Sequence, residues 1–233
     1  MNRHMAGLLA VALLAAVASA APPVNGVFAC FGPAVGLVNF DSLDIAFSQG
    51  GVSLTDKPSS LQLGFGGAGF VLVEKVVIGG SCWGGSQTVG SDDLRATIEI
   101  AGGEFDIGYR ALSLRRLLIA PMLGIGGGGY TIKLQDTSDA PRSFHGLLQN
   151  PGMTSKVSFS GLTLSPQLMI TIPISVVGVQ LRGGYCYTPV NPQWKLEGGR
   201  EQFKGPAISK GMPFVTLNVT LGGFEGGKRR SGK

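Results

Sequence analysis

The sequence predicts an all-β fold, a closed antiparallel up-and-down β-barrel of about eight strands. Three observations support it: segments that alternate apolar and polar residues, connections that alternate between short and long, and an export signal at the N-terminus. Only 14% of the 233 residues are charged, and the 38 glycines lie among aliphatic and aromatic residues. This composition is apolar for a soluble domain and unlike that of a disordered chain.

The first twenty residues, 1–20, are expected to be a secretory signal peptide. Arg3 supplies a positive charge, residues 6–18 form an apolar run, and residues 18–20 read Ala-Ser-Ala, a small-residue cleavage pattern. The alternative is an uncleaved membrane anchor, because the apolar stretch can be extended beyond this site.

The barrel itself is expected at residues 34–224, after an irregular lead-in at 21–33 and before a basic C-terminal tail at 225–233. The strand-like segments are 34–40, 60–72, 75–85, 94–112, 116–134, 156–172, 177–187 and 212–224. Short connections at 73–74, 113–115 and 173–176 alternate with long ones at 41–59, 86–93, 135–155 and 188–211. Tight turns at one end and long loops at the other are typical of a membrane barrel.

A short helix is expected after the first strand. Residues 41–49 begin with Asp41, a helix-capping residue type, and carry a partial apolar face. Such a helix could plug the barrel or cover its mouth.

The fourth segment changes its apolar parity at Gly102-Gly103. Its apolar residues are even-numbered up to Ile100 and odd-numbered from Phe105 onwards, as a β-bulge at the glycine pair would produce. The alternative is a two-residue hairpin there, which together with a similar break at 126–129 would give ten strands.

Two sets of residues are candidates for structural or functional roles. Polar and charged side chains on the inward parity of the central strands are expected to form a network in the lumen: Glu99, Glu104, Asp106, Arg110, Lys133, Gln180 and Arg182. Aromatic residues near the strand ends are expected to form interfacial girdles: Phe70, Trp83, Tyr109, Tyr130, Phe159, Tyr185, Tyr187, Phe214 and Phe224. Lumen glycines such as Gly64 and Gly184 would leave space for a narrow polar path.

Enzymatic chemistry is not expected. His145 is the one histidine after the predicted signal, and no orienting carboxylate accompanies it and Ser143 at a characteristic spacing. Cys30, Cys82 and Cys186 show no metal-binding spacing, so neither a metal nor a cofactor is expected. The excess positive charge lies in the tail, which gives little support for nucleic-acid binding.

The chain resembles the small outer-membrane β-barrel proteins, in architecture the OmpA-transmembrane and OmpW-like barrels. The resemblance covers residues 34–224 and includes the terminal strand PFVTLNVTLGGF, whose Phe224 is followed by nine further residues. It implies the bacterial outer membrane as location, and membrane lipid and the outer-membrane assembly machinery as partners. No catalytic or ligand-binding residues follow from it.

Three functions remain open at this point. The first is an integral outer-membrane barrel with a structural or surface-recognition role through its long loops. The second is a narrow channel or carrier for small solutes. The third is a soluble lipocalin-like barrel whose apolar parity faces inward around a small apolar ligand.

Overall fold

The computed structural model describes residues 24–49, 55–91, 94–114, 117–138, 154–174, 176–189, 193–197, 202–203, 205–206 and 208–226. The predicted signal peptide and most of the basic tail lie outside these residues. The elements are β1 (Val24–Leu37), α2 (Asp41–Gln49), β2 (Leu61–Val73), β3 (Val76–Gly90), β4 (Leu94–Tyr109), β5 (Leu112–Leu114), β6 (Leu117–Asp136), β7 (Thr154–Pro173), β8 (Val177–Tyr187), β9 (Trp194–Leu196), β10 (Gln202–Phe203) and β11 (Gly211–Gly226).

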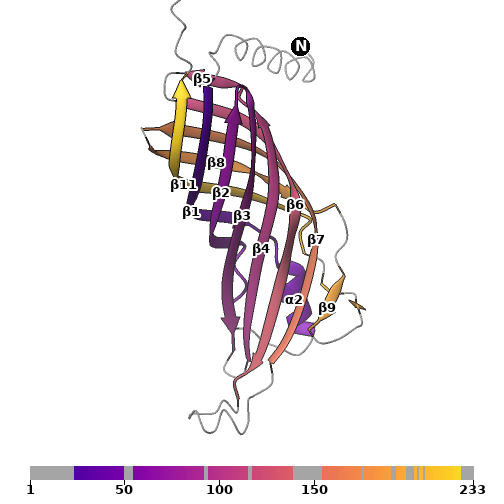
Figure 1. Ribbon diagram of the computed structural model, residues 1–233. Coiled ribbons are helices and arrows are strands. Elements are labelled where there is room, and N and C mark those ends of the chain that lie inside the picture. Colours follow the sequence, from indigo (N-terminus) through magenta and orange to yellow (C-terminus); the bar gives the residue numbers. More distant parts are fainter. Residues whose placement is uncertain are drawn as a thin grey trace, which may run out of the picture.

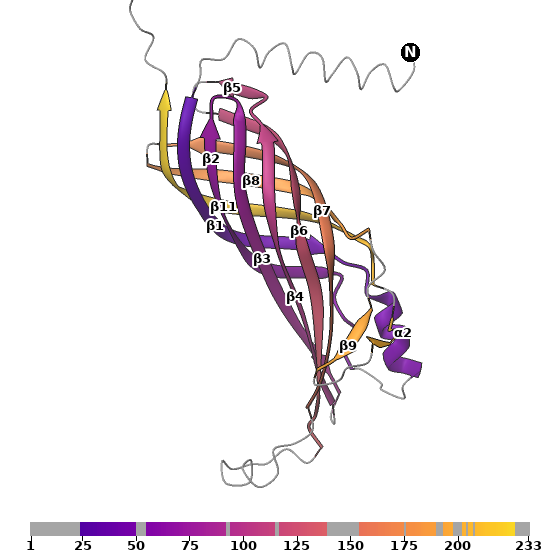
Figure 2. The same cartoon turned by 45° about the vertical axis from the view of Figure 1, so that its right-hand side comes forward.

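Eight of the strands close into an antiparallel barrel. Their order is β1-β2-β3-β4-β6-β7-β8-β11, and β11 pairs with β1 to complete the ring (Figures 1 and 2). The short strands β5, β9 and β10 pair only at its margins. The predicted count of eight is confirmed, and the alternative of ten barrel strands is wrong.

Two predicted boundaries need correction. The lead-in is not irregular, because β1 begins at Val24 and its first residues pair with both β2 and β11. The predicted long loop at 86–93 is mostly strand, since β3 continues to Gly90 and pairs with β4 along its whole length. Both segments are rich in glycine or polar residues, which obscures strand periodicity in the sequence. By contrast the β2–β3 turn is as tight as predicted, with Glu74 at a φ of 54°.

The parity change in β4 is not a bulge. The pairing of β4 with β3 and β6 runs without interruption through Gly102-Gly103, and even-numbered residues face inward on both sides of the pair. Ile98 is fully buried inside the barrel, whereas Ile107 is 45% exposed on its outer wall. The backbone therefore keeps its alternation, and the environments on the two faces of the strand exchange character.

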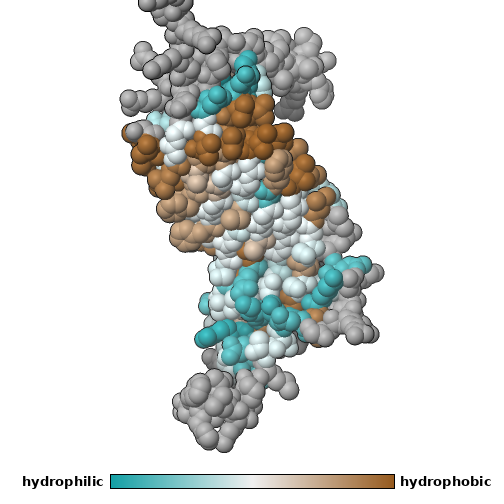
Figure 3. Space-filling view, viewed as in Figure 1, coloured by the Kyte–Doolittle hydropathy of each residue, from teal (hydrophilic) through white to brown (hydrophobic). Residues whose placement is uncertain are grey.

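This exchange divides the barrel into two halves. The turn-side half, which carries the connections at residues 74–75 and 174–176, has an apolar outer wall; the loop-side half, which carries α2 and β9, has a polar one. Figure 3 shows the hydrophobic band near the first end and hydrophilic residues at the other. Exposed wall residues of the turn-side half include Val71, Ile78, Phe105, Leu123, Ile125, Leu168, Val179, Leu217 and Val219.

Strand length explains the division. A tilted strand needs about 9–11 residues to cross a bilayer. The 11 residues of β8 fit this length, whereas β6 and β7 have 20 each and therefore continue well beyond the apolar band. The continuation of β3, β4, β6 and β7 forms a curved sheet outside the band (Figure 1).

The predicted helix is present as α2, and it contributes to an apolar core of the loop-side half. Leu43 and Phe47 of α2 pack in one cluster with inner-face residues of the long strands, and Trp194 of β9 joins it. The ring of Phe40 meets Tyr130 edge-on, with 6.2 Å between centroids. No helix in the described residues is long and apolar enough to cross a membrane.

Candidate functional site

A layer of buried polar side chains lies inside the barrel between two apolar clusters. On the turn side the cluster contains Phe28, Phe70, Leu72, Met122 and Met169, and on the loop side it is the core that α2 covers. The polar layer comprises Ser81, Glu104, Asp106, Thr163, Ser165, Gln167, Thr171, Gln180, Arg182, Thr216, Asn218 and Thr220. A small barrel interior is just wide enough for such side chains to fill.

Two carboxylates and one guanidinium carry the formal charge of this layer. Glu104 accepts hydrogen bonds from the hydroxyls of Thr163 and Ser165. Asp106 is fully buried, accepts a hydrogen bond from the amide of Gln167, and lies 3.6 Å from Nη1 of Arg182 through its Oδ2. The ion pair is thus held in place by neighbouring neutral donors, as buried charges require.

Neutral side chains continue the layer on the opposite wall. Nδ2 of Asn218 donates to Oε1 of Gln180 at 3.1 Å, and the thiol of Cys30 donates to the same oxygen at 3.1 Å. Gln180 in turn lies 3.4 Å from the hydroxyl of Thr171. These contacts join β1, β7, β8 and β11 across the interior.

The structure brings together five of the seven predicted lumen residues inside the barrel. Glu104, Asp106, Arg110, Gln180 and Arg182 are all buried. The prediction is wrong for Glu99 and Lys133, which form an ion pair on the outer wall of the loop-side half, with side chains 39% and 40% exposed. Their strands do alternate, but in this half the polar face is the outer one because it faces water.

Sequence reasoning missed several buried polar residues of the interior. Gln62, Ser81, Gln167 and Thr216 are buried inside the barrel yet carry no charge that singles them out. Strand parity could have indicated them, because each lies on the inward face of its strand, as the buried charged residues and the residues of the apolar clusters do.

The nine predicted girdle residues separate into two groups. Tyr109, Tyr185 and Tyr187 lie on the outer wall and are 40–46% exposed, Tyr109 at the turn end of β4 and the other two at the loop end of β8. The inward group consists of Phe70, Trp83, Tyr130, Phe159 and Phe214, which belong to or pack against the interior. The side chain of Phe224 lies outside the described residues. The girdle prediction is therefore wrong for these five residues, whose inner-face positions place them in or against the two apolar clusters of the interior.

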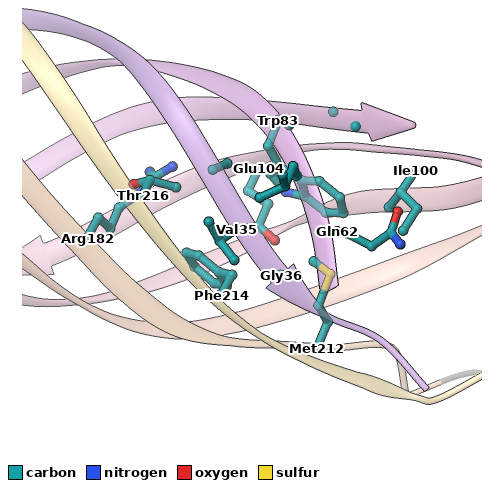
Figure 4. A pocket seen from close by; sticks show the side chains of 15 residues that line it. Val35, Gly36, Gln62, Trp83, Ile100, Glu104, Arg182, Met212, Phe214 and Thr216 are labelled. Carbon is teal, nitrogen blue, oxygen red and sulfur yellow. The ribbon is translucent and has the colours of Figure 1, made fainter. Parts of the chain in front are cut away.

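A small cavity lies where the polar layer meets the loop-side core (Figure 4). Its volume is about 40 Å³, and its polar lining consists of Gln62, Glu104, Arg182 and Thr216. The apolar lining includes Trp83, Ile100, Met212 and Phe214. A second interior cavity, next to Tyr130 and Cys186, measures about 20 Å³.

The lumen glycines do not widen the interior as expected. A methyl group at Gly64 would overlap the carbonyl oxygen of Gly84, and one at Gly184 would overlap that of Pro166. These glycines permit neighbouring strands to approach closely, so they tighten the wall.

The arrangement offers acid, base and hydrogen-bonding groups but no recognisable catalytic set. In the part of the chain that the structure describes, no three His, Cys, Asp or Glu residues are placed to hold a metal ion. Ser143 and His145, for which no enzymatic role is expected, lie outside the described residues. Cys30 and Cys186 are buried thiols, and Cys82 is exposed on the outer wall.

Comparison with known proteins identifies the fold. No family model matches the chain, and no curated protein does so. Among solved structures, the attachment invasion locus protein Ail of Yersinia pestis aligns with a TM-score of 0.51 at 10% identity, covering 86% of this chain and 99% of Ail. A major outer membrane protein of Thermus thermophilus gives 0.50 at 10% identity, covering 83% and 99%. The chain therefore has the fold of the small eight-stranded outer-membrane β-barrels.

Proposed function

We propose that this protein is a closed barrel of the bacterial outer membrane that displays its loop-side half at the cell surface for a structural or recognition role. One observation carries the proposal: along the same strands, the outer wall is apolar near the turns and carries polar and charged side chains such as Glu99 and Lys133 near the loops. A membrane fits around the turn-side half, because the wall there presents a band of aliphatic side chains without an exposed ion pair such as Glu99–Lys133. The loop-side half is built like a water-exposed domain.

The interior argues against the channel. Two apolar clusters flank a polar layer in which Glu104 and Asp106 accept hydrogen bonds and Arg182 faces Asp106, and the cavities described above measure about 40 and 20 Å³. The outward apolar wall of the turn-side half likewise argues against a soluble lipocalin-like barrel, which needs its apolar side chains to face inward. The printed name of Ail concerns attachment, which makes attachment a reasonable first recognition assay here.

Cysteine labelling on intact cells tests the topology. In a Cys82→Ser background, a membrane-impermeant maleimide should label Thr97→Cys on the outer wall of the loop-side half. The matched variant Lys75→Cys, in the β2–β3 turn, should react only after the outer membrane is permeabilised. Labelling of Lys75→Cys on intact cells with protection of Thr97→Cys would reverse the orientation and remove the surface role.

Planar-bilayer recording and cell attachment test the role itself. The purified barrel should give no conductance steps above the protein-free bilayer. A non-adherent strain that displays the barrel should attach to cultured cells more than one displaying Thr97→Glu together with Thr131→Glu, whereas Lys75→Gln should attach like the unaltered protein. Stable conductance steps would favour the channel, and equal attachment by all strains would contradict the recognition role.

A further inference from the structure

We propose that an open groove on the outer wall, where β4, β6 and β7 leave the apolar band, binds the phosphate-bearing headgroup of a membrane lipid. The inference rests on the proposed position of the membrane around the turn-side half, because that position brings lipid headgroups to this part of the wall. Three observations support it: a concave surface that no side chain fills, its position at the edge of the band, and an excess of positive charge at its far end.

The groove lies over three neighbouring strands and has a volume of about 840 Å³. Ligand pockets commonly measure about 300–1,000 Å³, so this space can hold a lipid headgroup. Ala101, Gly127 and Gly129 form its floor with their main chain and small side chains, and they lie side by side on the outer face of β4 and β6. The hydroxyl-bearing residues Thr131 and Ser158 line its loop-side end. In Figure 3, residues of near-neutral hydropathy lie between the hydrophobic band and the hydrophilic end of the molecule.

The packing of the barrel does not require a glycine at the centre of this floor. A methyl group at Gly127 would lie 3.7 Å from the nearest atom, the carbonyl oxygen of Gly161, which is an ordinary contact distance. At the preceding, inward-facing Gly126, a methyl group would instead overlap the carbonyl oxygen of Gly103. Close approach of the strands therefore explains Gly126 but not Gly127, whose missing side chain only keeps the groove open.

The groove begins at the loop-side edge of the apolar band. On the outer face of β6, Ile125 is 44% exposed in the band, and Gly127, Thr131 and Lys133 follow it in that order towards the loops. Leu162 of β7, which is 49% exposed, lines the end of the groove next to the band. Because a strand rises about 3.3 Å per residue, Gly127 and Lys133 are roughly 20 Å apart along β6. A lipid whose chains lie against Ile125 and Leu162 therefore has its headgroup in the groove.

Positive charge is in excess at the loop-side end of the groove. Lys133 and Lys156 lie directly opposite each other on the outer face of β6 and β7, and Lys195 of β9 lies beside them on the same face. Glu99 pairs with Lys133 and Glu197 pairs with Lys156, whereas Lys195 forms no ion pair with any of the described residues. Three ammonium groups and two carboxylates leave a net charge of one positive. A phosphate group is the lipid component that ammonium groups at a membrane surface attract, and it would also reduce the repulsion between the opposed lysines.

Native mass spectrometry of the purified protein in detergent tests the site. The probe is dilauroyl phosphatidic acid, and the comparison is dilauroylglycerol, which has the same chains without the phosphate. We expect one saturably bound phosphatidic acid per barrel and about tenfold weaker binding of dilauroylglycerol. Gly127→Leu should abolish the saturable binding, because its side chain fills the groove. The matched control Gly69→Leu, on the outer face of β2 where an added methyl group meets nothing within 4 Å, should bind like the unaltered protein.

A second variant tests the charge without altering the groove. Lys195→Gln should weaken the binding of phosphatidic acid about threefold, whereas Lys75→Gln in the β2–β3 turn should leave it unchanged. The faster migration of unheated samples on a gel shows that each variant is folded. Equal binding of the two lipids would overturn the phosphate assignment, and unaltered binding by Gly127→Leu would overturn the groove. The detergent assay does not depend on orientation in the cell, so absent lipid binding together with surface labelling of Thr97→Cys would contradict this site alone, whereas reversed labelling would contradict the proposed function.

Discussion

The two halves of the barrel share the same strands, but they differ in the face on which these strands carry ion pairs and exposed or buried isoleucines. In the turn-side half, aliphatic residues such as Ile125 face outward and the charged Arg182–Asp106 pair lies inside. In the loop-side half, Ile98 lies inside and the Glu99–Lys133 pair lies outside. Alternation along a strand therefore shows that the two faces of the strand lie in different environments. The medium around the barrel determines whether the outer face is apolar.

The largest expected difference concerns the two ion pairs. Arg182→Met leaves Asp106 as an unpaired buried charge, and we expect it to lower the free energy of unfolding by about 3–5 kcal/mol. Lys133→Met breaks the exposed pair and should cost at most about 1 kcal/mol. Urea unfolding in phospholipid vesicles, followed by tryptophan fluorescence, gives both values. Similar costs for the two variants would mean that the turn-side interior is hydrated like a surface.

The change in wall polarity also shows which features of the barrel can be predicted from the sequence. Alternation and turn residues predicted eight strands, the tight β2–β3 turn and the helix at residues 41–49, because these features depend on neighbours in the sequence. The parity change at Gly102-Gly103 was misread as a bulge, because a bulge and an exchange of environments leave the same pattern of letters. Glu99 and Lys133 were misplaced for the same reason.

The interior cavity could not be predicted from the sequence for a different reason. Gln62 and Thr216 come from β2 and β11, which lie on either side of β1 only because the last strand closes the ring. Nothing near either residue in the sequence indicates that they share a cavity.

A charged residue introduced on the outer wall tests directly whether its position faces lipid or water. Ile125 and Thr131 lie on the same strand and the same outer face, the first in the apolar band and the second next to Glu99 of β4. Ile125→Arg should destabilise the barrel by about 2–4 kcal/mol in vesicles, because it moves a charge into hydrocarbon. Thr131→Arg should stay within about 0.5 kcal/mol. Equal effects would place Thr131 within the membrane as well.

Removing a single methyl group gives the finest contrast between the halves. Ile98 is fully buried against protein, so Ile98→Val leaves a void that its packed neighbours fill only in part, and we expect a loss of about 0.5–1.5 kcal/mol. Ile125 is 44% exposed in the apolar band, where mobile lipid chains can occupy the vacated space, so Ile125→Val should cost less than about 0.5 kcal/mol. Unfolding of both variants in the same vesicles measures the difference. If the order were reversed, the loop-side core would be loosely packed, and the rigid platform that the surface role requires would be absent.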